Sequence, residues 1–442
     1  MINIKIPNNN ISERKFIIDF IFGDYLGLEY YITVDELNID YSILLGESEL
    51  LIRDCFFNNY LQPLSYLKKG AIPEKVHYVK NEFTTENDIP VIFGSDTISV
   101  NNKRIICGID IFASSFFMLT RWEEYLIEGR DEHDRFKGSE SLAFKSGFLH
   151  RPIVNEYVEM LWKMMLKSGF DCARQQRDFE LVLTHDVDEL EFPKSYRILA
   201  GDLIKRKSVR LLWKHFIYMF ISNPYDTFDI LMSASESLGI KSRFYFMSSD
   251  KNQLPPEHRY DLNSKLFKSK IRDIKKRGHI IGFHPGYYSY KNDIRWSNEK
   301  KILEEAVDEE IIEGRQHFLL LDIPYTFLLW ERNNMRLDST LGYYDKEGFR
   351  CGTGDSFKIY NFIDQRTLSL KERPLIIMDG TLYDYQKYSL EKSLTILENY
   401  LQLGRKYKTP ITLLFHNNGF NTKWEGNCSH LYRRLLNLKS GK

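Results

Sequence analysis

Hydrophobic positions in the first part of the chain recur at both helical and strand-like spacing. Phe112 and Phe116 lie on one face of a predicted helix over residues 111–126, which is typical of a helix packed on a core. Two strands are predicted within residues 41–57, joined by a Gly-Glu-Ser turn. Further helices are predicted over residues 12–22 and 154–166. The pattern predicts a mixed α+β domain over residues 1–175, in which we identify no catalytic motif.

The pattern changes after residue 178, where short apolar runs alternate with amphipathic helices. This alternation is typical of βαβ units and predicts an α/β domain with a parallel sheet over residues 176–442. The predicted strands are residues 179–184, 243–247, 279–283, 375–378 and 411–415. The predicted helices are residues 263–277, 297–314 and 390–403, the last stopped by Gly404. A basic and aromatic segment, residues 193–224, interrupts the alternation and predicts an inserted helical excursion with a solvated charged face.

Composition narrows the classes of protein. The chain has 442 residues, of which 43% are hydrophobic, so it can bury a core and is not a disordered protein. Lys+Arg and Asp+Glu both number 61, which gives no general attraction for nucleic acid. No stretch approaches the ~20 apolar residues of a membrane span, and the N-terminus lacks a signal-peptide pattern. We therefore expect a cytoplasmic protein with no membrane span.

Two compositional features bear on the site. The five cysteines are widely spaced and include no CxxC pair, which argues against a disulfide framework and a thiolate zinc site. Aromatic residues make up 14% of the chain. They fit either core packing or a groove that stacks sugar rings, and composition leaves both interpretations open.

Polar side chains follow several of the predicted strands. A Thr-His-Asp-Val-Asp run at 184–188 ends the first strand, and His284, Asp379 and His416 each follow a later one. In a parallel α/β barrel the carboxyl ends of the strands meet on one face, where the active site forms. The recurrence of carboxylates and imidazoles at these ends therefore predicts an active site there.

Asp186 and Asp188 are two residues apart, so in an extended segment both carboxylates point to the same side. Two close carboxylates repel one another unless a cation lies between them, and His284 is the best candidate for an additional ligand. Oxygen and nitrogen ligands suit a divalent metal, most simply Zn, with Co, Ni or Fe as alternatives. The other interpretation is a loop-capping Asp pair beside a structural His.

With these motifs, residues 176–440 resemble the polysaccharide deacetylase family, also called carbohydrate esterase family four. The resemblance implies a distorted (β/α) barrel. The run at 184–188 is similar to the first family motif, which implies Asp186 as the general base and Asp188 as a metal ligand. The second motif, His-x-x-x-His, is matched only in part, because Tyr288 stands where the second ligand is expected.

The resemblance and the strand-end positions supply the remaining candidates. His284 would be a metal ligand. His317 is a candidate for the missing nitrogen, and the other interpretation is an exposed or core histidine at a helix end. Arg350, in a Gly-Phe-Arg-Cys-Gly-Thr run, would hold the base carboxylate ionised. His416, in Leu-Phe-His, is similar to the family's general acid, and Asp379 would orient it.

The implied activity is that of a hydrolase acting on carbon–nitrogen bonds other than peptide bonds. It would remove acetyl groups from N-acetylated or O-acetylated sugars by metal-activated water, with a carbohydrate substrate that Tyr287 and Tyr288 could help to bind. Two alternatives remain, a degenerate homologue that only binds glycan and an amidohydrolase acting on a small cyclic amide. The N-terminal half resembles a domain of unknown function that accompanies some bacterial deacetylases, and this resemblance supplies no role.

Overall fold

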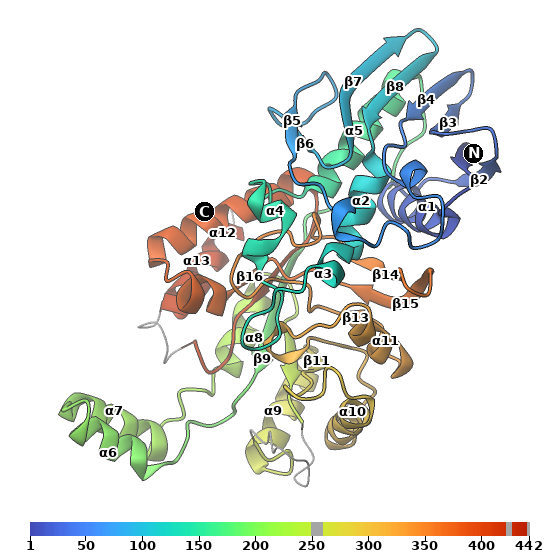
Figure 1. Cartoon of the computed structure of the whole chain (residues 1–442). Coiled ribbons are helices and arrows are strands. Elements are labelled where there is room, and N and C mark those ends of the chain that lie inside the picture. Colours follow the sequence, from blue (N-terminus) through green and yellow to red (C-terminus); the bar gives the residue numbers. More distant parts are fainter. Residues whose placement is uncertain (249–259, 421–426, 440–442) are drawn as a thin grey trace. The chain divides into compact units, whose positions relative to one another are not determined.

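The computed structural model describes residues 1–248, 260–420 and 427–439 (Figure 1). The chain forms two compact units. The first contains Met1–Glu180, Leu319–Ile376 and Tyr400–Ile411, and the second contains Leu181–Phe318, Ile377–Asn399 and Thr412–Lys442. The division at residue 175 into an accessory and a deacetylase-like domain stays a prediction.

The first unit is built on a mixed sheet with the strand order β2-β1-β3-β4-β8-β7. Strands β3 and β4 are antiparallel and form the hairpin expected from the sequence, with Gly46 in the left-handed conformation at its turn. A separate pair, β5 and β6, is also antiparallel. The bounds are Ile2–Pro7 (β1), Tyr30–Asp35 (β2), Tyr41–Leu45 (β3), Ser48–Ile52 (β4), His77–Val79 (β5), Ile89–Val91 (β6), Gly94–Asn101 (β7) and Arg104–Ile109 (β8).

Helices complete the first unit. Their bounds are Ile11–Ile18 (α1), Ile111–Thr120 (α2), Trp122–Leu126 (α3), Leu142–Lys145 (α4), Ile153–Lys167 (α5) and Tyr325–Arg332 (α11). The unit also holds three strands in the order β14-β15-β13, namely Phe357–Asn361, Arg366–Glu372 and Leu337–Asp338. The predicted mixed α+β character of the N-terminal part is confirmed.

The predicted helix over residues 111–126 is wrong in one respect, since it is two helices. Arg121 adopts the left-handed conformation (φ 53°) and separates α2 from α3. Its guanidinium is buried and pairs with Glu123 and Glu124, the second and third residues of α3. These buried ion pairs offset the strain of a positive φ at a residue other than glycine.

Aromatic side chains fill the core of the first unit. The ring of Phe116 lies 6.2 Å from that of Phe16 and 5.5 Å from that of Tyr360, measured between centroids. All three side chains are buried. For these rings, packing is the correct interpretation of the aromatic content.

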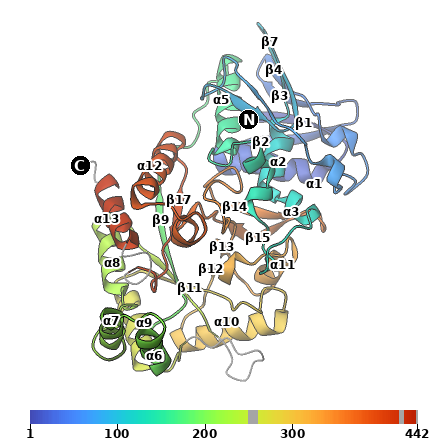
Figure 2. The same ribbon diagram turned by 60° about the vertical axis from the view of Figure 1, so that its left-hand side comes forward.

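The second unit contains strands in the order β12-β11-β10-β9-β17-β16. The pairs β9–β10, β10–β11, β11–β12 and β16–β17 are parallel, which confirms the predicted α/β class and agrees with a distorted barrel. The strand bounds are Leu181–Val187 (β9), Arg243–Phe246 (β10), Ile280–Phe283 (β11), Glu313–Gly314 (β12), Ile377–Met378 (β16) and Ile411–Leu414 (β17). Figure 2 shows the helices of this unit outside its strands. The helix bounds are Tyr196–Ile204 (α6), Val209–Phe220 (α7), Phe228–Ser237 (α8), Lys265–Lys276 (α9), Asp293–Val307 (α10) and Asn427–Lys439 (α13).

Two predicted helix ends are wrong. Helix α10 stops at Val307 because Asp308 takes the left-handed C-terminal position, and Gly314 belongs to β12 instead. Helix α12, Leu390–Tyr407, continues through Gly404. A Cβ at Gly404 would lie 2.6 Å from the Phe179 ring and 2.7 Å from Ile411 Cγ1, so this glycine permits close packing and does not cap the helix.

Within residues 1–248, 260–420 and 427–439, no helix combines the length and the apolar character needed to cross a bilayer.

Candidate active site

Five strands of the second unit present polar side chains at or just beyond their carboxyl ends. Asp186 lies near the end of β9, and Asp188 follows that strand directly. The residues that follow the other four strands are His284 (β11), Arg315 and His317 (β12), Asp379 (β16) and His416 (β17). Because paired parallel strands end at the same edge of a sheet, these short strands bring together residues that are far apart in sequence.

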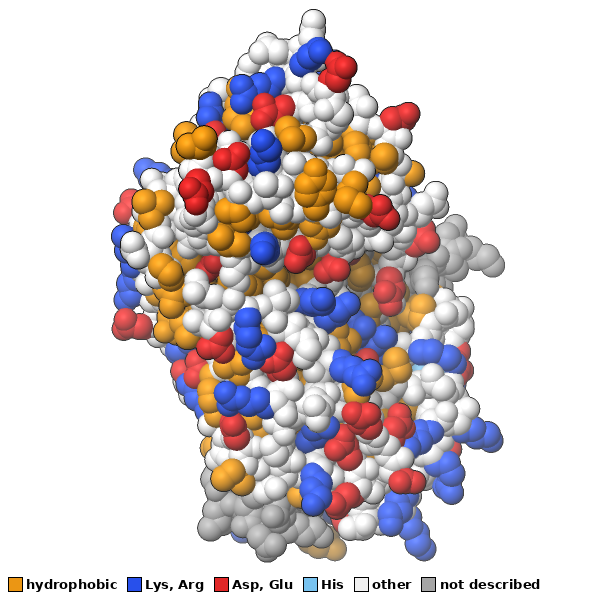
Figure 3. Space-filling model, turned by 90° about the vertical axis from the view of Figure 1, so that its right-hand side faces the viewer, with side chains coloured by type: hydrophobic (Ala, Val, Ile, Leu, Met, Phe, Trp, Pro, Cys, Tyr) orange, Lys and Arg blue, Asp and Glu red, His pale blue; other side chains and the backbone are white. Residues whose placement is uncertain are grey.

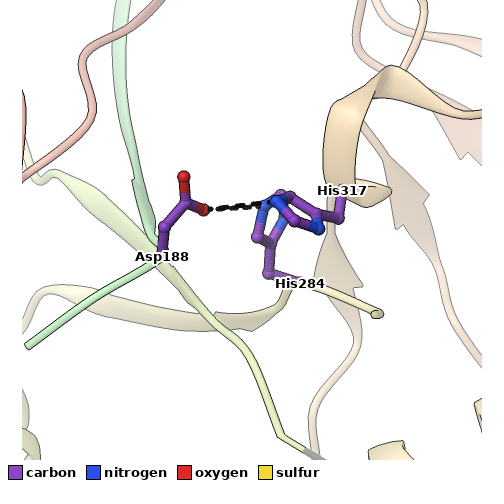
Figure 4. Close-up of side chains that lie close together, drawn as sticks. All are labelled: Asp188, His284 and His317. Atoms are coloured by element: carbon purple, nitrogen blue, oxygen red, sulfur yellow. Dashed lines mark ion pairs between the residues drawn. The ribbon is translucent and has the colours of Figure 1, made fainter. Parts of the chain in front are cut away.

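Asp188, His284 and His317 form a group with the geometry of a metal site (Figure 4). One ligand atom from each lies within 4.8 Å of the others. Asp188 Oδ1 is 3.4 Å from His284 Nε2 and 3.8 Å from His317 Nε2. The structure thus places His317 with the two other predicted ligands.

The surrounding contacts fit a cation at this group. His284 Nδ1 lies 2.7 Å from the carbonyl oxygen of Arg315, so Nδ1–H donates and the Nε2 lone pair faces the group. Asp188 Oδ1 and His284 Nε2 are both buried and make no hydrogen bond. Buried polar atoms are rarely left unpaired, and a metal would satisfy both. One carboxylate and two imidazoles leave a coordination position open, as catalytic metal sites do.

The charges within the group also favour a cation. Burial alone would lower the pKa of His284, but the carboxylates of Asp186 and Asp188 raise it above its ordinary value. Burial alone would raise the pKa of Asp188, but His284, His317 and His416 lower it. These side chains therefore stabilise positive charge between the carboxylates of Asp186 and Asp188, which a divalent cation would supply while the imidazoles stay neutral.

Asp186 borders this group and is held by an arginine that the sequence analysis missed. Asp186 Oδ2 lies 3.8 Å from His284 Nε2, while Oδ1 accepts a hydrogen bond of 2.8 Å from Arg315 Nη1. The same nitrogen donates to Thr184 Oγ1 at 3.0 Å, so one guanidinium fixes two residues of β9. The three side chains are buried. Arg315 follows a strand of only two residues, which is too short to be predicted from periodicity. In the sequence, only its position two residues before His317 could have marked it as a site residue.

The prediction for Arg350 is corrected by these contacts. Its guanidinium binds the carboxylate of Glu124 and donates to the carbonyl oxygen of Gly342 at 2.7 Å. Arg350 and Glu124 both belong to the first unit and are buried. The guanidinium that positions Asp186 is that of Arg315, so Arg350 serves the first unit's interior.

His416 and Asp379 are paired, as their strand-end positions predict. Asp379 Oδ1 lies 2.6 Å from His416 Nδ1, and Asp379 Oδ2 accepts a 2.7 Å hydrogen bond from the His416 backbone N–H. Although burial lowers it, the charge and hydrogen bond of Asp379 raise the pKa of His416 to about 9. Asp379 therefore favours the protonated imidazole, and it contacts His416 through Nδ1 and the backbone N–H.

Two side chains connect the site to solvent. The side chain of Asp188 is 20% exposed and that of His416 is 19% exposed, whereas Asp186, His284 and Asp379 are buried. A substrate that arrives from solvent would thus meet the metal-site carboxylate and the protonated imidazole first.

The two tyrosines proposed to bind sugar lie beside the His317 turn. The ring centroid of Tyr287 is 5.0 Å from that of Tyr288 and 5.4 Å from that of Phe318. Tyr288 is exposed, and the Arg295 guanidinium lies over its ring. Their role in substrate binding stays a prediction.

A family model matches the N-terminal part of the chain. Residues 2–169 match the model of a family of unknown function, DUF7033. This agrees with the sequence-based expectation of an N-terminal domain without an assigned role. No match to the chain was found among curated protein sequences.

Several solved structures are similar to the chain. A putative polysaccharide deacetylase from Mycobacterium smegmatis has a TM-score of 0.40 and 15% identity, and the match covers 60% of this chain and 85% of that one. Puue allantoinase gives 0.39 and 14%, with coverage of 60% and 85%. The peptidoglycan N-acetylglucosamine deacetylase Bc1960 gives 0.29 and 14%, with coverage of 60% and 83%.

Proposed function

We propose that this chain is a metal-dependent hydrolase that removes acetyl groups from N-acetylated or O-acetylated sugars. The observation that carries the proposal is that three groups of side chains lie at the carboxyl ends of the parallel strands. These are the Asp188/His284/His317 group, the carboxylate of Asp186 held by Arg315, and the Asp379–His416 pair. The resemblance to polysaccharide deacetylases supplies the substrate class.

The metal ligands would be Asp188, His284 and His317, and Zn is the simplest occupant for this donor set. A bound divalent cation would lower the pKa of a water molecule from about 15.7 towards ~7 and polarise the acetyl carbonyl. Asp186 borders the group and is placed to accept a proton from an attacking water. Arg315 holds this carboxylate in one orientation, so that one oxygen faces the group.

His416 would act on the leaving group. As the carbon–nitrogen bond breaks, the amine needs a proton, and the Nε2–H of protonated His416 can give it. Asp379 binds Nδ1 and so fixes the direction in which Nε2 points. The water's proton thus goes to Asp186, the proton of His416 goes to the amine, and the products are acetate and the free amino sugar.

The proposal is tested by elemental analysis together with an acetate-release assay on chitooligosaccharides and acetylated monosaccharides. We expect about one divalent cation per wild-type chain and far less in Asp188→Ala and in His284→Ala. Chelation should stop acetate release, and added Zn, Co, Ni or Fe should restore it. Metal retained unchanged in both variants would remove the proposed site, and a loaded chain that releases no acetate would exclude the deacetylase activity.

His317 gives a sharper prediction, because it stands in for a ligand that the second motif lacks. The His317→Ala variant should bind metal at least 10-fold more weakly, since even loss of an outer-shell partner weakens metal binding 10–100-fold. Competition with a chromophoric chelator measures this affinity. Tyr288→Ala serves as the control and should bind metal as the wild type does. Equal affinities for His317→Ala and wild type would exclude His317 as a ligand.

The Asp379–His416 pair predicts a change in pH dependence. Asp379 raises the pKa of His416, and the acid form is lost as the pH rises through that pKa. The Asp379→Asn variant should therefore move the basic limb of the kcat/KM profile down by about 1–3 pH units, the effect of losing one adjacent opposite charge. Cys428→Ser is a matched control. The Cys428 sulfur lies 3.7 Å from Asp379 Oδ2, so the substitution changes a neighbour of Asp379 without removing the carboxylate charge. A basic limb unmoved in Asp379→Asn would rule out this role for the pair.

A further inference from the structure

The inserted segment between β9 and α8 forms a pair of helices with an apolar outer face. Helices α6 and α7 lie side by side in both views (Figures 1 and 2). On α7 the exposed apolar side chains recur three, four and seven residues apart, which places them on a single helical face. They are Val209, Trp213, Phe216, Ile217 and Phe220.

These side chains form a continuous aromatic surface. The ring centroids of Trp213 and Phe216 are 5.8 Å apart, and those of Phe216 and Phe220 are 5.0 Å apart. Trp213 is 61% exposed. Helix α6 adds exposed Tyr196, Leu203 and Ile204. Single exposed apolar residues are normal, but an aligned row of large ones marks an interaction surface.

Specific side-chain contacts hold the two helices of the hairpin together and fix its base. Asp202 of α6 is buried and binds His215 of α7 at 2.6 Å between Oδ2 and Nδ1, as well as Arg206. The Phe192 ring stacks on His215 with centroids 5.5 Å apart. At its foot, Asn223 accepts a hydrogen bond from the Phe192 backbone N–H and donates to the carbonyl oxygen of Leu190. These contacts use the inner sides of the helices and leave the apolar face outward.

Basic residues accompany this apolar face. Residues 193–224 contain seven Lys and Arg and one acidic residue, Asp202, so the segment carries +6 in a chain whose net charge is zero. Lys207, Arg210 and Lys214 are exposed in the turn between the helices and along α7. On the face drawn in Figure 3, by contrast, basic and acidic side chains are interspersed.

We propose that the α6–α7 hairpin docks on the surface of an anionic lipid bilayer. A face that combines Trp and Phe with flanking Lys and Arg is the pattern of helices that lie in the interfacial plane of a membrane. The aromatic rings would enter the headgroup region, and the basic side chains would contact acidic headgroups. A second copy of the hairpin is a poorer occupant, because two surfaces of +6 repel one another.

The position of the hairpin relates it to the candidate active site, although the docking inference does not depend on the proposed function. The inserted segment begins at Pro193, five residues after Asp188. Asn417, the neighbour of His416, donates hydrogen bonds to the carbonyl oxygens of Glu189 and Tyr225 at the two sides of the foot. A docked hairpin would thus hold the carboxyl ends of β9 and β17 near the lipid surface, as suits a substrate carried on lipid.

Vesicle flotation of the full chain tests the inference. Wild type should float with phosphatidylcholine vesicles that contain roughly one-third phosphatidylglycerol and stay in solution with pure phosphatidylcholine. The combined Trp213→Ser, Phe216→Ser and Phe220→Ser variant should bind at least tenfold more weakly, because it removes the inserting side chains. The proposal would be overturned if wild type did not bind the anionic vesicles, or if this variant bound them as strongly as wild type.

The basic residues are tested by a second combined variant, Lys207→Gln, Arg210→Gln and Lys214→Gln. It should also bind at least tenfold more weakly, and wild-type binding should weaken with added salt. The matched control replaces exposed apolar residues outside the hairpin, Leu37→Ser, Leu61→Ser and Ile294→Ser, and should float as wild type does. A control that loses binding equally would show nonspecific adsorption and overturn the proposal.

Trp213 provides a direct probe of insertion. Among the tryptophans that the structure describes, Trp213 is exposed and the others are buried. Its fluorescence emission should therefore shift to the blue when anionic vesicles are added and the ring leaves water. Trp213→Phe should lose most of the shift and still float, since phenylalanine keeps the apolar contact. Light scattering measures the oligomeric state in parallel. One outcome would overturn the membrane proposal in favour of self-association. In it, wild type is a dimer that does not bind vesicles, and the combined aromatic variant is a monomer.

Discussion

The Asp186→Asn variant is expected to lower kcat for acetate release by about 10²–10⁴-fold, the typical contribution of a positioned general base. Asparagine keeps the shape of the side chain and can still accept a hydrogen bond from Arg315, but it cannot take a proton from water. The three metal-site residues are unchanged, so elemental analysis should find wild-type metal content. Loss of rate with metal retained separates the base from the ligands.

Asp229→Asn is the matched control for this substitution. It removes the same charge from a highly exposed carboxylate on α8, whose partner is Arg277. This control should release acetate at the wild-type rate. Equal turnover by Asp186→Asn and wild type would exclude Asp186 as the base, and simultaneous loss of metal would reassign it as a ligand.

The part of the site that the sequence predicts is the part carried by recognisable strands. β9, β11 and β17 are buried apolar runs, so the positions that follow them could be identified as Asp188, His284 and His416. The i, i+2 spacing of Asp186 and Asp188 gave their shared direction without a structure. Parallel pairing then brings these ends together, which is why strand-end position was a sufficient signal.

Arg315 could not be predicted from strand-end positions, for a physical reason. It follows β12, which has only two residues and so shows no periodicity. The local run around Arg350 looked more like the expected arginine motif, but its partner is Glu124, 226 residues away in sequence. A pairing at that separation is set by tertiary structure. His317 was found as a candidate because the second motif lacked a histidine and left a ligand to be supplied.

The same distinction explains the errors in the fold. Apolar periodicity located α5 and α9 and the strands β9, β10, β11, β16 and β17, because each buries one face or two. At the break, the Arg121 guanidinium lies 3.0 Å from the hydroxyl of Tyr343, 222 residues away in sequence, and α12 passes through Gly404 where a Cβ would meet Phe179. Local propensity favours a continuous helix at the first position and a stop at the second, and tertiary contacts override it in both.

The interior of the first unit holds a buried ion network that explains why Arg350 is unavailable elsewhere. Glu124 Oε1 accepts hydrogen bonds of 3.0 Å from Nε of both Arg121 and Arg350. The Tyr343 hydroxyl lies 3.0 Å from Arg121 Nη2 and 3.3 Å from Glu124 Oε1. All four side chains are buried. Glu124 is thus the anion shared by two buried guanidinium groups, and removing its charge leaves both undercompensated.

The Glu124→Gln variant should therefore lose about 3–5 kcal/mol in the free energy of unfolding of the first unit at neutral pH. Burial raises the pKa of Glu124, but Arg350 and Arg121 lower it below the ordinary 4.5, so the stabilisation is present above that value and disappears as the pH falls through the lowered pKa. The gap between variant and wild type should accordingly narrow in acid. Urea denaturation followed by hydrogen–deuterium exchange across residues 111–126 measures it. The control is Glu128→Gln, whose carboxylate is 86% exposed and pairs with an exposed lysine, and which should not change stability measurably. A Glu124→Gln chain as stable as this control would show that the network is dispensable, because the two guanidinium groups would then be compensated by Glu123, Tyr343 and backbone carbonyls alone.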